Sequence, residues 1–211
     1  MNDFPALAIL DKGGLLIWPI LLCSLVGTTI FFERFALYRN IQKYFRNSRR
    51  NINLLLDDPL TTKKNLENDL SEYSADKRIL IEALSLENPD HETMEIVLSH
   101  GVEREVFSLS KTLSTLAVIA SVCPLLGLLG TVIGMIKAFM VVETMGGSVN
   151  AAVLAGGIWE AMLTTAVGLL AAIPLLFFHN HLEGKLHLIQ AELEEVAISF
   201  MKAWTKTHNK V

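Results

Sequence analysis

One acidic residue, Glu160, interrupts an otherwise uncharged apolar run between Ala151 and Phe178. A strongly polar side chain at such depth in a bilayer costs about 2.5–3.5 kcal/mol on insertion scales, so it faces protein or a polar path. Apolar surroundings favour the neutral acid, which can take up and release a proton. Glu160 is therefore a candidate for proton exchange. The structural alternative, a protonated Glu160 that bonds between helices or reaches toward the interface, stays open.

Small and hydroxyl residues accompany this acid at helical spacing. On the same run they are Gly157, Thr164 and Gly168, with Thr165 beside them. A similar face on the preceding run comprises Gly127, Gly130, Thr131 and Gly134. The two faces suggest a narrow path lined by hydroxyls. Tight helix packing explains the glycines equally simply, and a threonine in a membrane helix often bonds its own backbone.

The relay formed by these residues is incomplete. The apolar runs contain no second acid, histidine or arginine near mid-depth, and Lys137 lies toward the end of its run with no assignable role. We therefore expect another chain to supply a second titratable group. Pro124 and Pro174 each remove a backbone donor inside a run and are predicted to shape their helices.

These residues need membrane helices to position them. The chain has 211 residues, 51% of them hydrophobic, and a mean hydropathy of +0.41, which indicates a membrane protein with a polar portion. We predict an all-α membrane protein with spans at 13–34, 112–142 and 151–179, each long enough to cross a bilayer.

Basic residues predict the orientation of these spans. Segment 35–111 holds eleven Lys and Arg and the tail 180–211 holds four, whereas segment 1–12 holds one and turn 143–150 none. The positive-inside rule places 35–111 and 180–211 in the cytoplasm as helical extensions, and 1–12 and 143–150 in the periplasm. The N-terminus is then outside and the C-terminus inside.

The extensions carry apolar stripes at helical spacing. One stripe runs without a breaker from Met94 to Leu116, which predicts a single long helix from about His91 to Met140. Another stripe after Asn180 has heptad-like spacing and comprises Leu182, Leu186, Ile189, Leu193, Val196 and Phe200.

Several classes of function have no support in the sequence. A net charge of -4 implies no nucleic-acid partner. No nucleophile elbow, phosphate loop or metal-ligand spacing appears, so we predict no enzyme, no cofactor and no metal site. Cys23 and Cys123 both fall in apolar runs and are interpreted as packing residues.

Two ordered motifs, PLLGLLGTVIGMIKAF at 124–139 and AGGIWEAMLTTAVGLLAAIP at 155–174, resemble the MotA/TolQ/ExbB proton channel family, and ExbB most closely. The resemblance implies a multi-pass protein of the bacterial inner membrane. Its ring-like homo-oligomer, a pentamer, would surround an ExbD-like single-span partner with a membrane aspartate. Proton flow would drive motion passed to a TonB-like protein for outer-membrane uptake of iron chelates or vitamin B12.

The resemblance also assigns roles to single residues. It makes Thr131 and Thr165 pore-lining threonines and Glu160 the family's third-span glutamate. Two alternatives remain: a TolQ-like subunit of a Tol-Pal envelope system, and a passive membrane scaffold that only holds its partners together.

Overall fold

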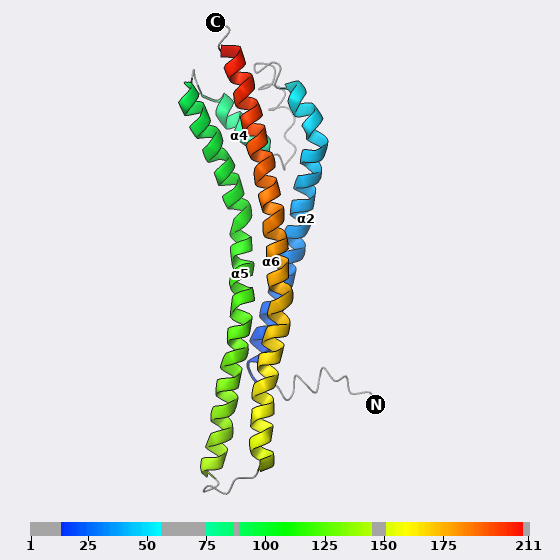
Figure 1. Ribbon diagram of the computed structural model, residues 1–211, viewed down its shortest axis with the longest axis vertical. Helices are drawn as coiled ribbons and strands as arrows, with labels where there is room; N and C mark the ends of the chain where they lie inside the picture. The colour runs from blue at the N-terminus through cyan, green and yellow to red at the C-terminus, as the bar shows by residue number, and fades with distance from the viewer. Residues whose placement is uncertain (1–13, 56–74, 87–88, 145–150, 209–211) are drawn as a thin grey trace. The chain divides into compact units, whose positions relative to one another are not determined.

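The computed structural model describes residues 14–55, 75–86, 89–144 and 151–208, and its regular elements there are all helices (Figure 1). They are α2 (Ile17–Leu55), α4 (Ala75–Leu84), α5 (His91–Thr144) and α6 (Ala151–His208). The all-α class is thereby confirmed. Most of the predicted periplasmic segments 1–12 and 143–150 lies outside the described residues.

Three of the described helices are long and apolar enough to span a membrane, as predicted: Ile17–Phe45, His91–Thr144 and Leu154–Lys206. The single long helix expected from about His91 is also confirmed, because α5 is continuous over 54 residues. At 1.5 Å per residue α5 is about 80 Å long, whereas the apolar core of a bilayer is about 30 Å thick. Pro124 and Pro174 both lie inside unbroken helices.

The start of α5 is fixed by a local cap. The carboxylate of Asp90 accepts a hydrogen bond from the backbone amide of Thr93 at 3.2 Å, which satisfies one of the free donors of a first helical turn. Hydrogen bonding from Thr93 lowers the pKa of Asp90 below its ordinary value. Pro89 directly precedes this cap in the sequence.

The chain forms two compact units. The first consists of Met1–Phe32 and Thr112–His181, and it contains the apolar parts of α2, α5 and α6. Leu116, Cys123 and Leu175 form part of its buried core, and the rings of Phe31 and Phe178 stack with centroids 4.0 Å apart. Large apolar side chains also cover its outside, among them Leu125, Phe139, Trp159, Leu170 and Phe177. Such a surface suits lipid or other membrane helices.

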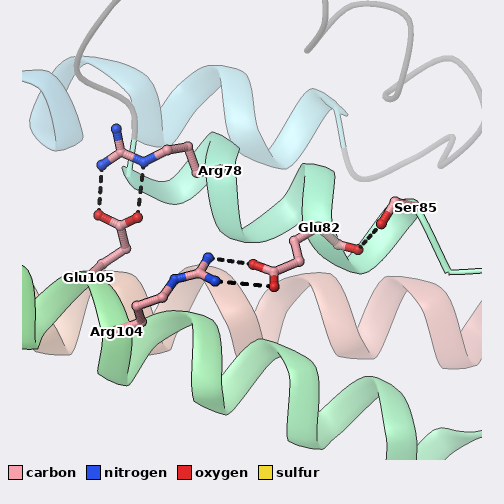
Figure 2. Close-up of polar contacts among 5 residues, drawn as sticks. All are labelled: Arg78, Glu82, Ser85, Arg104 and Glu105. Carbon is pink, nitrogen blue, oxygen red and sulfur yellow. Dashed lines mark hydrogen bonds and ion pairs between the residues drawn. The ribbon is translucent and has the colours of Figure 1, made fainter.

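The second unit consists of Glu33–Lys111 and Leu182–Val211. The predicted heptad-like stripe of α6 forms part of its core. Val196 is half-buried, and the other five residues are buried: Leu182, Leu186, Ile189, Leu193 and Phe200. Helix α4 packs closely on α5, since a Cβ built on Gly101 would lie 3.1 Å from Cγ2 of Ile79. Two ion pairs, Arg78–Glu105 and Arg104–Glu82, join the same two helices (Figure 2).

Candidate functional site

In the first unit, α5 and α6 touch along their small residues. A Cβ built on Gly134 would lie 2.8 Å from Cβ of Ala161, and one built on Gly157 would lie 2.6 Å from Cβ of Ala138. A Cβ on Gly168 would meet the carbonyl oxygen of Cys123 at 2.8 Å. These distances leave no room for a side chain at the three glycines, so the helix backbones approach each other as closely as small residues allow.

The contact between the two helices continues at Gly127 and Gly130. A Cβ on Gly127 would lie 3.0 Å from the carbonyl oxygen of Thr164, and one on Gly130 would lie 2.6 Å from Cβ of Thr164. Residue numbers rise along α5 while the numbers of the residues that face them on α6 fall. The small residues therefore form an antiparallel seam in which each helix fills the gaps of its neighbour.

The hydroxyl groups of the three threonines all donate to backbone carbonyls. Thr164 is only 3% exposed, and its hydroxyl donates to the carbonyl of Ala161 at 2.7 Å. Thr131, which is half-buried, donates to the carbonyl of Leu128 at 2.7 Å. Thr165 instead crosses between helices and donates to the carbonyl of Gly127 at 3.0 Å. Thr165 therefore ties α6 to α5.

These contacts bear on the hypothesis of a hydroxyl-lined path. Within one chain the two small faces lie against each other, and Thr164 is buried between them. Thr131 and Thr165 are half-buried, so neither is enclosed by this chain alone. The hydroxyl-lined path stays a prediction for the assembled protein.

Glu160 lies one turn along α6 from Thr164 and lies against Gly14, just before the start of α2. It is half-buried, and a Cβ built on Gly14 would lie 2.5 Å from its Oε1 atom. Gly14 has φ +68°, a left-handed conformation that side chains disfavour.

Sequence reasoning missed Gly14. The available signal was the pair Gly13-Gly14 directly before the first apolar run, which indicates a tight entry into a helix. The other singled-out residues lie away from this contact. Lys137 is exposed on α5, and Cys23 and Cys123 are free thiols, with Cys123 buried. Within the described part of the chain no group of three or more His, Cys, Asp or Glu could hold a metal ion.

Three helices of spanning length, two of them packed along a seam of small residues, are features of a multi-pass membrane protein. The chain belongs to the MotA/TolQ/ExbB proton channel family, whose model matches residues 62–195. The membership predicted from 124–139 and 155–174 is thereby confirmed, and no enzyme family is indicated.

Two relatives in the family and one solved structure show how similar this chain is to known proteins. The chain is 32% identical to the biopolymer transport protein exbB1 of Vibrio cholerae, over 76% of this chain and 72% of the relative. It is 40% identical to the Tol-Pal system protein TolQ of Haemophilus influenzae, over 44% of this chain and 40% of the relative. The structure of C. jejuni MotAB has a similar fold, with a TM-score of 0.57 at 16% identity, covering 96% of this chain and 86% of that one.

Proposed function

We propose that this chain is the proton-conducting subunit of an ExbB-type motor complex in the bacterial inner membrane. The observation that carries the proposal is Glu160, an acid kept within an apolar span and seated against Gly14. A passive scaffold has no need of such a costly residue. Membership of a proton channel family supports protons as the ion.

Assembly is part of this proposal. The chain would form a pentamer with its N-terminus in the periplasm and its C-terminus in the cytoplasm, with spans at 13–34, 112–142 and 151–179. The half-buried sides of Thr131 and Thr165 would face the centre of the ring. There an ExbD-like single-span protein would contribute the second acid that this chain lacks near mid-depth.

The proposed output is mechanical work. Protons would pass between the partner's aspartate and Glu160, and the resulting motion would act on a TonB-like protein that energises outer-membrane uptake of iron chelates or vitamin B12. The relative named exbB1 aligns over most of its length and supports this role. The TolQ relative, which matches at higher identity over a shorter stretch, favours a second candidate, a subunit of a Tol-Pal envelope system.

The first experiment is an intact-mass measurement on the detergent-purified complex, after co-expression with the single-span protein encoded beside it. Five copies of this chain with two of the partner would agree with the proposal. A monomer or dimer without partner would contradict it, because the central pore would not exist. Growth on an iron chelate, compared with resistance to detergent, then separates the ExbB role from the TolQ role in a strain that lacks the chain.

A further inference from the structure

A groove of about 690 Å³ opens between α5 and α6 in the second unit. We call it the α5/α6 groove; residues that line it include Glu95, Glu103, Val106, Phe107, Glu194 and Ile198. Phe107 is 71% exposed and Ile198 is 54% exposed. Apolar side chains held open to water at this level indicate a surface that another helix covers.

The charges of the groove indicate what kind of helix covers it. Glu95, Glu103 and Glu194 line it together with one lysine, Lys202, so its carboxylates outnumber its ammonium groups. A partner with an apolar stem and a positive end fits this combination. Lysine and arginine have that form, because their methylene chains cover apolar surface while their charged groups reach the carboxylates.

The same unit presents such a surface on α2. Tyr38, Ile41 and Phe45 are buried, whereas Arg39 and Lys43 are exposed on the other side of the helix. Residues four apart lie one above the other on a helix. Arg39 and Lys43 therefore form a basic ridge that points away from the core of their own chain.

The basic ridge and the groove lie at the same height along the helices. The hydroxyl of Tyr38 donates to the carbonyl of Leu109 at 3.0 Å and fixes the two helices at that level. Lys43 is five residues beyond Tyr38 on α2, about 7.5 Å, and Glu103 is six residues from Leu109 on α5, about 9 Å in the same direction. Arg39 lies about 1.5 Å beyond Tyr38, and Phe107 lies about 3 Å beyond Leu109 in the same direction. These two residues are therefore also at similar heights.

We infer that the α5/α6 groove binds the basic ridge of α2 from a neighbouring copy of this chain. Rotation about an axis along the helices preserves height, so Lys43 of one copy meets Glu103 of the next and Arg39 covers Phe107. Two different surfaces pair in this contact, and a repeated contact of that kind closes into a ring when its rotation divides a full turn. The inference rests on the proposed homo-oligomer, and it does not depend on proton conduction.

The two kinds of contact have different tasks. Burial of Phe107 and Ile198 supplies most of the affinity, while the pairs of opposite charge fix the register and disfavour other pairings. Anionic lipid headgroups attract Arg39 and Lys43 too, yet lipid leaves the carboxylate-lined groove at the same height uncovered. A second copy accounts for both surfaces at once.

Cross-linking between single-cysteine copies tests the contact. Cys23 and Cys123 are first replaced by alanine, and two differently tagged copies, one with Lys43→Cys and one with Glu103→Cys, are co-expressed with the single-span partner. A bismaleimide about as long as a Lys–Glu pair is expected to join them into dimers that carry both tags. Ser108→Cys, which is exposed on α5 but outside the groove, replaces Glu103→Cys as the control and is expected to yield few dimers.

A charge exchange provides the second measurement. Lys43→Glu is expected to lower the fraction of full-size complex roughly fivefold, because it places like charges together at every interface. Adding Glu103→Lys in the same chain is expected to restore the full-size fraction. Unchanged helicity by circular dichroism shows that the variants are folded.

The outcomes separate this inference from the proposed function. A full-size complex that conducts protons but gives no mixed dimers, with a mass unaffected by Lys43→Glu, would overturn the inference alone. So would a Lys43→Glu variant whose only defect is weaker binding to vesicles of anionic lipid. Mixed dimers in a complex without proton flux would leave the inference standing and remove the proposed function.

Discussion

The carboxylate of Glu160 and the backbone of Gly14 are in direct contact: a Cβ built on Gly14 would lie 2.5 Å from Oε1 of Glu160. The two residues lie far apart in the sequence, Gly14 just before α2 and Glu160 within α6. Gly14 adopts φ +68°, so both its conformation and its lack of a side chain allow the contact. We therefore expect a side chain at residue 14 to displace Glu160.

Gly14→Ala tests this expectation. The substitution is expected to cost about 1–2 kcal/mol in backbone strain and to displace the carboxylate, which lowers proton flux through the complex. Asparagine adopts the left-handed backbone conformation more readily than alanine but still carries a Cβ. Gly14→Asn therefore displaces the Glu160 side chain with less backbone strain. If Gly14→Asn complexes of normal mass conduct protons like the parent, the contact does not matter for function.

The seam between α5 and α6 predicts a size limit at Gly130. Gly130→Ala places a methyl group against Thr164 and is expected to destabilise the protein by about 1–3 kcal/mol, a typical cost of overpacking. Thermal unfolding in detergent, followed by circular dichroism, measures the change. Adding Thr164→Gly removes the opposing side chain and is expected to recover part of the loss.

Gly156→Ala is the matched control for that measurement. Gly156 lies on the same helix as Thr164, and nothing approaches within 4 Å of its built Cβ. Alanine forms helix better than glycine, so Gly156→Ala is expected to be neutral or stabilising by up to about 1 kcal/mol. Equal destabilisation by the Gly130 and Gly156 variants would show that the seam is not the cause.

The two ion pairs of the second unit are expected to differ in strength (Figure 2). Glu105 accepts two hydrogen bonds from Arg78, at 2.9 and 2.6 Å, and its side chain is only 11% exposed. The hydrogen bonds that Arg78 donates to this buried carboxylate raise the pKa of Arg78 above its ordinary value. Glu105→Gln is therefore expected to cost about 1–3 kcal/mol, a range that allows for the solvent exposure of Arg78.

Glu82→Gln is the comparison for Glu105→Gln. Glu82 pairs with Arg104 between the same helices, but its side chain is 41% exposed. Solvent screens such a pair, so the expected cost is smaller than that of Glu105→Gln. Denaturant unfolding of both variants measures the difference. An equal loss of unfolding free energy in Glu82→Gln and Glu105→Gln would contradict the ranking of the two pairs by burial.

Asp76 makes the stability of the chain depend on pH. Its carboxyl is buried and one oxygen has no hydrogen-bond partner, and burial raises its pKa above 3.8. The folded state then holds a proton that the unfolded state releases, so stability falls as pH rises from about 4 through the raised pKa. Asp76→Asn is expected to be more stable than the parent at pH 7, with a gain that shrinks toward pH 4.

Asp90 is expected to change stability with pH in the opposite direction to Asp76. Its pKa is lowered by hydrogen bonding from Thr93, so its contribution is present at neutral pH and is lost as pH falls through the lowered value. Asp90→Asn is expected to be slightly less stable than the parent at pH 7, with no difference in strong acid. Unfolding midpoints measured from pH 3 to 8 check both variants, and an Asp76→Asn gain that grows toward pH 4 would be the wrong sign.

The long helices could be predicted from the sequence because their signals are local. No breaker interrupts the apolar stripe from Met94 to Leu116, and the structure has one helix there. The stripe from Leu182 to Phe200 likewise forms a buried core, because its spacing places every member on one side of the helix.

The contacts of the candidate site could not be predicted in this way, because they join distant segments. Nothing in the sequence near Glu160 indicates that Gly14 lies against it. Thr164 and Thr165 are adjacent and chemically alike, yet Thr164 bonds its own helix and Thr165 bonds Gly127. Which of two neighbouring hydroxyls crosses to another helix depends on the rotation of α6 about its axis, and packing determines that rotation.

The most direct test of the account is proton flux into liposomes that contain the complex of this chain with its single-span partner. Glu160→Gln keeps the size and hydrogen-bonding groups of the side chain but cannot exchange a proton, so flux is expected to fall at least about tenfold while the mass of the complex is unchanged. Glu143→Gln, an exposed position at the end of α5, serves as the control. Parental flux in a correctly assembled Glu160→Gln complex would contradict the central claim that Glu160 carries protons.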